Sequence, residues 1–171
     1  WNGNDRSIPL SRFNEKNFIY SEDCLSMEWG VAISSGGVLD SIARFYINDK
    51  KNEDAEKYIT KILNQNPKYF PARILKGELL ISKHQTDEAI TIFKQLIKED
   101  PRSDSDHYYK GVAHLGKGKI RIAKRALATA VELNPRFIKA KLLLAETYLR
   151  EHDFDMAQKE SQEVLKIDPE N

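Results

Sequence analysis

The stretch DEAITIFKQLIKEDP, residues 87–101, reads as an amphipathic helix that ends at a proline. Its apolar residues recur at steps of three and four, which places them on one face of a helix. The same pattern ends three other stretches: KYITKILNQNP (57–67), RALATAVELNP (125–135) and KESQEVLKIDP (159–169). The four final prolines are 34 residues apart, so the sequence predicts tandem helical units of this length.

Two columns of this repeat accept only small residues when the units are set at 36–69, 70–103, 104–137 and 138–171. Small residues at positions 8 and 20 let two helices of one unit approach closely, and larger residues at positions 11, 24 and 27 fill the space around them. Each unit is therefore predicted to be a pair of packed helices. Position 8 is Ala43, Gly77, Gly111 and Ala145, and position 20 is Ala55, Ala89, Ala123 and Ala157.

The ends of the predicted helices follow from prolines and polar turns. Each proline ends the second helix of its unit, because the residue before a proline is pushed out of the α region. In the second unit, Thr86 is predicted to be the N-cap of the second helix, with Asp87 and Glu88 in its first turn. The predicted turns between the two helices of a unit are 48–54, 82–88, 116–119 and 150–155.

The unit resembles the tetratricopeptide repeat, whose period and pattern of small and large residues match these columns. The resemblance covers residues 36–171 in four copies, and no strand pattern accompanies them. It implies an all-α fold, a right-handed superhelix of about eight repeat helices, with the first helix of each unit lining a concave groove and the second lying outside. Two departures weaken single contacts: position 4 lacks the family's tryptophan, and Ser161 replaces a large residue at position 24.

Both ends of the chain depart from this frame. Residues 1–35 are predicted to be a separate N-terminal segment, with a degenerate helix at 21–33, that either caps the first unit or lies in a groove. The chain opens on Trp1, which suggests a trimmed product. The second helix of the last unit has no successor to cover it, so we expect either a longer array or a surface that self-associates.

Composition excludes few classes of function. Lys and Arg total 27 against 26 Asp and Glu, so no strong overall field selects nucleic acid or a membrane. The single cysteine, Cys24, permits no internal disulfide. The sequence therefore does not decide between the cytoplasm and, if a signal has been removed, the periplasm. No apolar run approaches the roughly 20 residues of a membrane-spanning helix.

The resemblance implies that ligands contact positions 2, 5, 9, 12 and 13 of the first helices. At these positions an apolar floor flanked by acids suits an extended or helical peptide with apolar anchors and a basic residue. The alternative is that some of these side chains only pack against neighbouring helices. The candidate groove residues are Ile74, Tyr108, Val112 and Leu142 for the floor, with Glu78, Glu146 and Lys139.

No pattern predicts a cofactor, a metal or catalysis. GVAHLGKG (111–118) has most of a phosphate-binding loop, but no strand precedes it and Gly118 stands where Ser or Thr should hold magnesium. The four histidines show no zinc-site spacing. No nucleophile and base stand out as a pair, so the chain is predicted not to be an enzyme.

A basic stretch runs from residue 107 to 131 and contains no acid. A solvated face is its first interpretation, an acidic protein partner its second, and nucleic acid its third, because no aromatic platform accompanies the charge. Its basic residues are Lys110, Lys117, Lys119, Arg121, Lys124 and Arg125.

These observations predict a non-enzymatic scaffold that binds a peptide or helix of a partner protein in the concave groove. Three alternatives stay open. The array is a self-associating spacer or oligomerisation module, the regulatory arm of a larger enzyme or of a secretion or assembly machine, or a part of a transcription regulator that uses the basic face. Repeat folds serve many functions, so the fold alone does not choose among them.

Overall fold

The computed structural model describes residues 36–169, which form eight α-helices and no strand. The predicted all-α repeat fold is confirmed. The expected helix at 21–33, and the choice between a cap and a groove-bound strip for residues 1–35, lie outside the described residues. The helices are α2 (Gly36–Asn48), α3 (Asn52–Gln65), α4 (Phe70–Ser82), α5 (Thr86–Glu99), α6 (Asp104–Gly116), α7 (Ile120–Leu133), α8 (Ile138–Arg150) and α9 (Phe154–Ile167).

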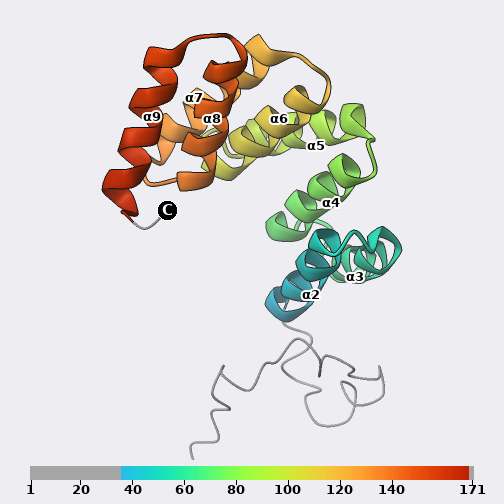
Figure 1. Ribbon diagram of the computed structural model, residues 1–171. Coiled ribbons are helices and arrows are strands. Elements are labelled where there is room, and N and C mark those ends of the chain that lie inside the picture. The colour runs from blue at the N-terminus through green and yellow to red at the C-terminus, as the bar shows by residue number, and fades with distance from the viewer. Residues whose placement is uncertain (1–35, 170–171) are drawn as a thin grey trace, which may run out of the picture.

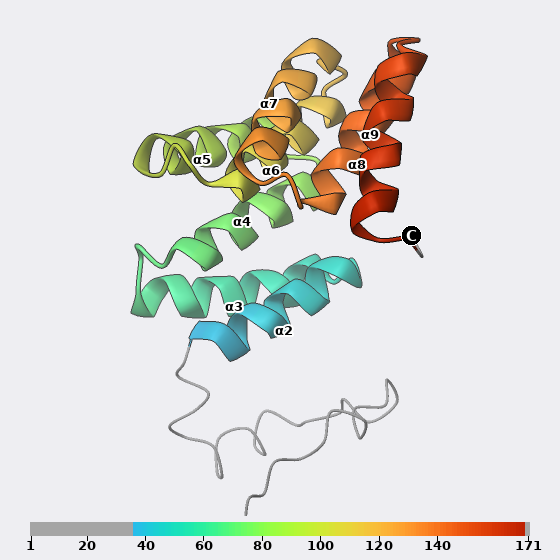
Figure 2. The same cartoon turned by 90° about the vertical axis from the view of Figure 1, so that its left-hand side faces the viewer.

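The helices repeat with the period of the prolines. The first helices of the four units begin 34 residues apart, and so do the second helices. Figures 1 and 2 show the resulting stack, with the α2–α3 pair at one end and the α8–α9 pair at the other. None of the described helices is long and apolar enough to cross a bilayer.

The second helices end as the prolines predict. The residue before each proline is extended, with φ near −140° at Asn66 (−141°) and Asp168 (−139°). Side-chain oxygens add a feature that the sequence analysis missed. Asn66, Asp100 and Asn134 each accept a hydrogen bond from the backbone N–H two residues later, at 3.2, 3.0 and 3.1 Å. Each of these three unit junctions is thus a proline turn held by a polar side chain.

The turn within each unit is left-handed at position 15. The φ values there are 58° at Lys50, 61° at His84, 67° at Gly118 and 61° at His152. Only glycine adopts this conformation without strain.

The prediction that Thr86 caps α5 is wrong. Thr86 is the first residue of the helix, and the N-cap, Gln85, makes no side-chain capping bond. Backbone hydrogen bonds close this turn instead, from His84 N to Ile81 O at 3.0 Å and from Gln85 N to Leu80 O at 2.8 Å. The chain therefore enters α5 one residue earlier than a side-chain cap at Thr86 would allow.

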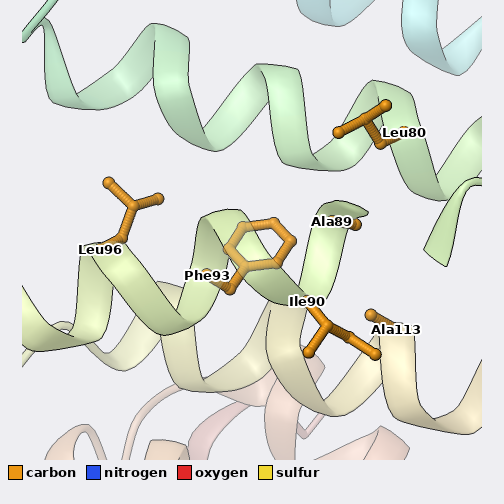
Figure 3. Packing of buried hydrophobic residues seen from close by; sticks show 6 residues of the cluster. All are labelled: Leu80, Ala89, Ile90, Phe93, Leu96 and Ala113. Atoms are coloured by element: carbon orange, nitrogen blue, oxygen red, sulfur yellow. The ribbon is translucent and has the colours of Figure 1, made fainter. Parts of the chain in front are cut away.

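Small residues at position 8 make room for the side chain at position 24 of the same unit. A Cβ on Gly77 would lie 2.3 Å from Cζ of Phe93, and a Cβ on Gly111 would lie 2.7 Å from Cγ of Leu127. Phe93 is fully buried at the centre of the largest apolar cluster, which α4, α5 and α6 share. Figure 3 shows its ring directed from α5 toward α4, while Ile90 is directed toward Ala113 of α6.

The first helices form the inner layer of the superhelix. α2 contacts α4, and α4 contacts α6, in addition to their contacts with the second helices. No two second helices are in comparable contact among the described elements. Elements crowd on the inside of a curve and separate on its outside, so α2, α4, α6 and α8 face inward.

Candidate functional site

The seven predicted groove residues lie on the first helices α4, α6 and α8, but their environments differ. On α4, Ile74 is half-buried and Glu78 has a side chain only 11% exposed. On α6, Tyr108 and Val112 are half-buried. On α8, the three predicted residues are exposed to solvent: Lys139, Leu142 and Glu146.

Glu78 belongs to a polar network that spans three units. The Arg44 guanidinium of α2 donates to Glu78 Oε1 at 2.7 Å and to the Tyr109 hydroxyl of α6 at 3.2 Å. Burial, and then the charge of Glu78, raises the pKa of Tyr109, so this hydroxyl stays neutral. The carboxylate that was predicted to receive a ligand's basic group thus already holds an arginine of the chain.

Ile74 and Tyr108 also have contacts within the array. Ile74 packs against the apolar cluster around Phe93. The ring of Tyr108 lies edge-on to Tyr109 at 5.1 Å between centroids and is tilted against Phe137 at 5.0 Å. Burial, and then Glu78, raises the pKa of Tyr108. Tyr108 of α6 thus contacts Phe137, the residue that precedes α8.

The inner face of α8 is the most open part of the predicted site. Lys139, Leu142, Glu146 and Leu149 follow one another at steps of three and four, so they form one stripe along the helix. Leu142 is 41% exposed and Leu149 is 51% exposed. Arg150 donates to Glu146 Oε1 at 2.7 Å, and both side chains remain half exposed. This stripe combines apolar side chains with both signs of charge.

Four inner-face residues were outside the predicted set: Arg44, Tyr109, Phe137 and Leu149. Arg44 and Glu78 had a visible signal, because opposite charges occupy position 9 of successive units. Leu149 also stood at position 12, which the family resemblance assigns to the groove. Tyr109 and Phe137 gave no such signal, because their contacts depend on how closely the first helices approach.

Asp106 is a buried carboxylate near the start of α6. Ala72 and Ala140 hold the same position 3 in the neighbouring units, and all three residues are fully buried. Neither carboxyl oxygen of Asp106 has a hydrogen-bond partner. Burial raises the pKa of Asp106 to about 6. The nearby Ser103 side chain and the charge of Arg73 oppose this rise, and the carboxylates of Asp100 and Asp104 add to it. Residues 106 and 108 lie about 200° apart around the helix, so Asp106 is directed away from the inner face.

The histidines within 36–169 have structural surroundings. His107 Nε2 lies 3.2 Å from the carbonyl oxygen of Pro101, and His114 is buried on α6. His84 and His152 occupy the left-handed turns. Within this range, no three His, Cys, Asp or Glu side chains form a group suited to a metal ion.

Comparisons with known protein families match residues 46–171. Two models of the tetratricopeptide repeat match the chain, at residues 46–115 and 108–171. A chicken (Gallus gallus) relative, DnaJ homolog subfamily C member 3, is 30% identical over 95 residues, which span 56% of this chain and only 19% of the relative.

Solved structures show the same fold. TTC0263, a thermophilic TPR protein of Thermus thermophilus, gives a TM-score of 0.75 at 19% identity, covering 88% of this chain and 80% of that chain. A chain of the Naa15/Naa10 complex bound to HypK-THB gives a TM-score of 0.69 at 21% identity, covering 80% of this chain and 20% of that chain.

Proposed function

The chain belongs to the tetratricopeptide-repeat family, and we propose that its array is a non-enzymatic scaffold that binds a segment of a partner protein on the inner face. The family serves in general as a protein-interaction module. The observation that carries the proposal is the exposed stripe on α8, where Leu142 and Leu149 face solvent, together with the contact of Tyr108 with Phe137 at the start of this helix. Apolar side chains that gather on one exposed face suit the anchors of a bound peptide or helix.

The charges on the stripe narrow the chemistry of this segment. Lys139 suits an acidic group of the ligand. Glu146 suits a basic one, although it shares its carboxylate with Arg150. Glu78 is less available because Arg44 occupies it. We therefore expect an amphipathic segment whose apolar side chains contact the α8 stripe and whose charges meet Lys139 and Glu146.

An affinity pull-down from native lysate tests the proposal, with three baits: wild type, Leu142→Ala/Leu149→Ala, and Ile122→Ala/Leu133→Ala. The last is a matched control, because Ile122 and Leu133 are exposed leucine-sized side chains on α7, at 45% and 36%. Circular dichroism first establishes that all three baits are folded. The proposal expects a protein that wild type and the control retain and the double variant loses. Adding Tyr108→Ala to the double variant tests the aromatic side of the same site.

The proposal fails if the double variant retains the same proteins as wild type. The result would then favour the second candidate function, self-association through the last unit. Leu165 and Phe154 support that candidate, because they are 50% and 62% exposed on α9, although Val164 of the same helix is buried within the unit. A mass above that of a monomer in light scattering, reduced by Leu165→Glu, would establish it.

A further inference from the structure

The structure divides the basic stretch 107–131 into paired and unpaired cations. Lys117 forms an ion pair with Asp87 of α5, and Lys124 forms one with Glu151 at the end of α8. The Lys124 ammonium also lies 5.4 Å from the centroid of the Tyr148 ring. These two lysines are committed to contacts between units. They therefore do not belong to the freely solvated face that was the first interpretation of this stretch.

Lys110 has no such partner within 36–169. It lies half-buried on α6, and neither a hydrogen bond nor an ion pair of its ammonium occurs among the described residues. Burial lowers the pKa of Lys110, and the charges of Lys94 on α5 and Arg125 on α7 lower it further. Two contacts place these cations near one another. The Phe93 and Tyr109 rings stack with centroids 5.6 Å apart, one residue before Lys94 and Lys110. Gly111 lies against Leu127 and the Ala123 carbonyl of α7, on either side of Arg125.

His114 lies one helical turn beyond Lys110 on the same face of α6. Its side chain is only 6% exposed, and its buried Nδ1 has no hydrogen-bond partner. Burial lowers the pKa of His114 first, and four surrounding lysines lower it further: Lys110, Lys119, Lys94 and Lys117. A neutral, unsatisfied imidazole thus lies within a concentrated positive field. We call Lys94, Lys110, Arg125 and His114 the outer cationic cluster.

The outer cationic cluster lies opposite the inner face. Lys110 is two residues from both Tyr108 and Val112, and a step of two residues turns a helix by about 200°. Lys94 and Arg125 are exposed on the second helices, which form the outer layer. A ligand of this cluster would therefore occupy a different side of the array from a peptide on the α8 stripe.

The cluster is costly for the isolated chain. Like charges held together in a partly buried site repel one another, and an unsatisfied buried polar atom weakens a fold by about 1–3 kcal/mol. Other interior cations of this chain have acids opposite them: Arg73 pairs with Glu99, and Lys141 pairs with Glu160. The chain thus neutralises interior cations in units two and four, whereas Lys110 of unit three has no carboxylate opposite it among the described residues.

We propose that the outer cationic cluster binds an acidic segment of a partner protein, whose carboxylates neutralise the three cations. Carboxylates fit the cluster because they bind ammonium and guanidinium groups by short, charge-assisted hydrogen bonds. A nucleic-acid strand fits less well, because its phosphates extend beyond three cations.

Fluorescence anisotropy with the whole 171-residue chain tests this site. The probe is a labelled peptide of consecutive glutamates, and a glutamine peptide of the same length is the negative probe. The test variant is Lys94→Gln/Lys110→Gln/Arg125→Gln. The matched control is Lys61→Gln/Arg136→Gln/Lys159→Gln, which removes the same charge from exposed positions without described ion pairs. Arg125→Gln alone replaces the test variant if circular dichroism shows that the triple variant is unfolded.

The expected result at about 0.15 M salt is a loss of affinity of about tenfold or more in the test variant and of less than about threefold in the control. Equal losses in both variants, or equal binding of the glutamine peptide, would overturn the proposal, because the attraction would then be unspecific. Tighter binding of a thymidine oligonucleotide, lost in the same variant, would reassign the cluster to nucleic acid.

The imidazole of His114 provides a second readout that general charge effects do not reproduce. Carboxylates bound at the cluster would offset the field of Lys94, Lys110, Lys117 and Lys119, so the pKa of His114 should rise when the glutamate peptide saturates the site. NMR titration of the imidazole with and without peptide measures this change. An unchanged pKa of His114 at saturation would place the peptide elsewhere and overturn the proposal.

Discussion

Units two (70–103) and three (104–137) follow one frame but bury different groups. In unit two, position 3 is Ala72 and position 11 is Leu80, both packed in apolar surroundings. In unit three, the same positions hold Asp106 and His114, which are buried with side-chain atoms that lack hydrogen-bond partners. The frame therefore tolerates polar groups at positions where packing alone would select apolar ones.

If the two proposed faces bind partners, this difference marks where binding would compete with stability. The unsatisfied groups of unit three gather on α6, the helix that carries Tyr108 on its inner face and Lys110 on its outer face. Natural proteins accept local losses of stability mainly at functional sites. Unit two buries larger apolar side chains, and its carboxylate Glu78 is used for a contact within the array. α6 thus carries the unsatisfied buried groups of unit three as well as residues of both proposed binding faces.

Truncation at position 24 should give the largest effect. Phe93→Ala should lower the free energy of unfolding by about 3–5 kcal/mol, and Leu127→Ala by about 2–4 kcal/mol, because each leaves a cavity in a closed core. The loss of stability should be larger for Phe93→Ala, since the Phe93 ring also stacks on Tyr109 with centroids 5.6 Å apart. Urea titrations followed by circular dichroism measure both losses. Thr60→Ala on an exposed face of α3 is the control, with an expected change within about 0.5 kcal/mol. A larger loss for Leu127 would contradict the view that the contacts of the Phe93 ring make the greater contribution.

Adding a methyl group at position 8 should also affect the stability of the two units differently, but by less than the truncations at position 24. A methyl group on Gly77 would lie 2.3 to 2.9 Å from three atoms of the buried Phe93 ring. Gly77→Ala should therefore destabilise by roughly 1–3 kcal/mol, despite its better helix propensity. Gly111→Ala should cost less, because the Leu127 side chain can change its rotamer. A double-mutant cycle of Gly77→Ala with Phe93→Leu should show coupling above about 0.5 kcal/mol, and additive effects would refute this contact as the cause.

Asp106→Ala should stabilise the chain by roughly 1–2 kcal/mol near pH 7, because it removes a buried carboxylate without a hydrogen-bond partner. The pKa of Asp106 is raised from 3.8 to about 6 in the fold, so ionisation weakens the native state fully above about pH 6. As the pH falls from 6 to 4, the native carboxyl is protonated and the wild type regains this stability. The advantage of the variant should therefore vanish near pH 4.

Stability curves of wild type and Asp106→Ala against pH measure this effect. The reciprocal change, Ala72→Asp, should introduce the same pH dependence into unit two. If the Asp106→Ala advantage did not depend on pH, its cause would be packing and not charge.

The left-handed turns should give the smallest effect. His84→Gly should stabilise by about 0.5–1 kcal/mol, and Gly118→Ala should destabilise by about 1 kcal/mol, because φ is positive at both positions. Thermal unfolding of the two variants, read against wild type, decides the point. Changes of the same sign in both variants would show that backbone strain at position 15 does not distinguish the units.

The sequence predicted the framework of the fold because its causes are local. The prolines, the small residues at positions 8 and 20, and the apolar periodicity each act within one unit. The candidate site was harder to predict from the sequence, because contacts such as that of Arg44 with Glu78 depend on the curvature that brings α2 and α4 together. The basic stretch shows the same limit. Sequence could not tell that Lys117 and Lys124 have partners in other units while Lys110 has none among the described residues, since helix packing decides it.

The junctions between units have a consequence for how such a chain can change length. Asn66, Asp100 and Asn134 form equivalent joints before their prolines, so deleting residues 70–103 would rejoin the chain with the geometry of an existing joint. The backbone geometry at each joint would therefore accept the deletion. The side chains would no longer match, because Arg44 would then face Val112 at position 9 in place of Glu78. The side chains of the inner surface therefore fix the order of the units, whereas the joints do not limit how many units can follow one another.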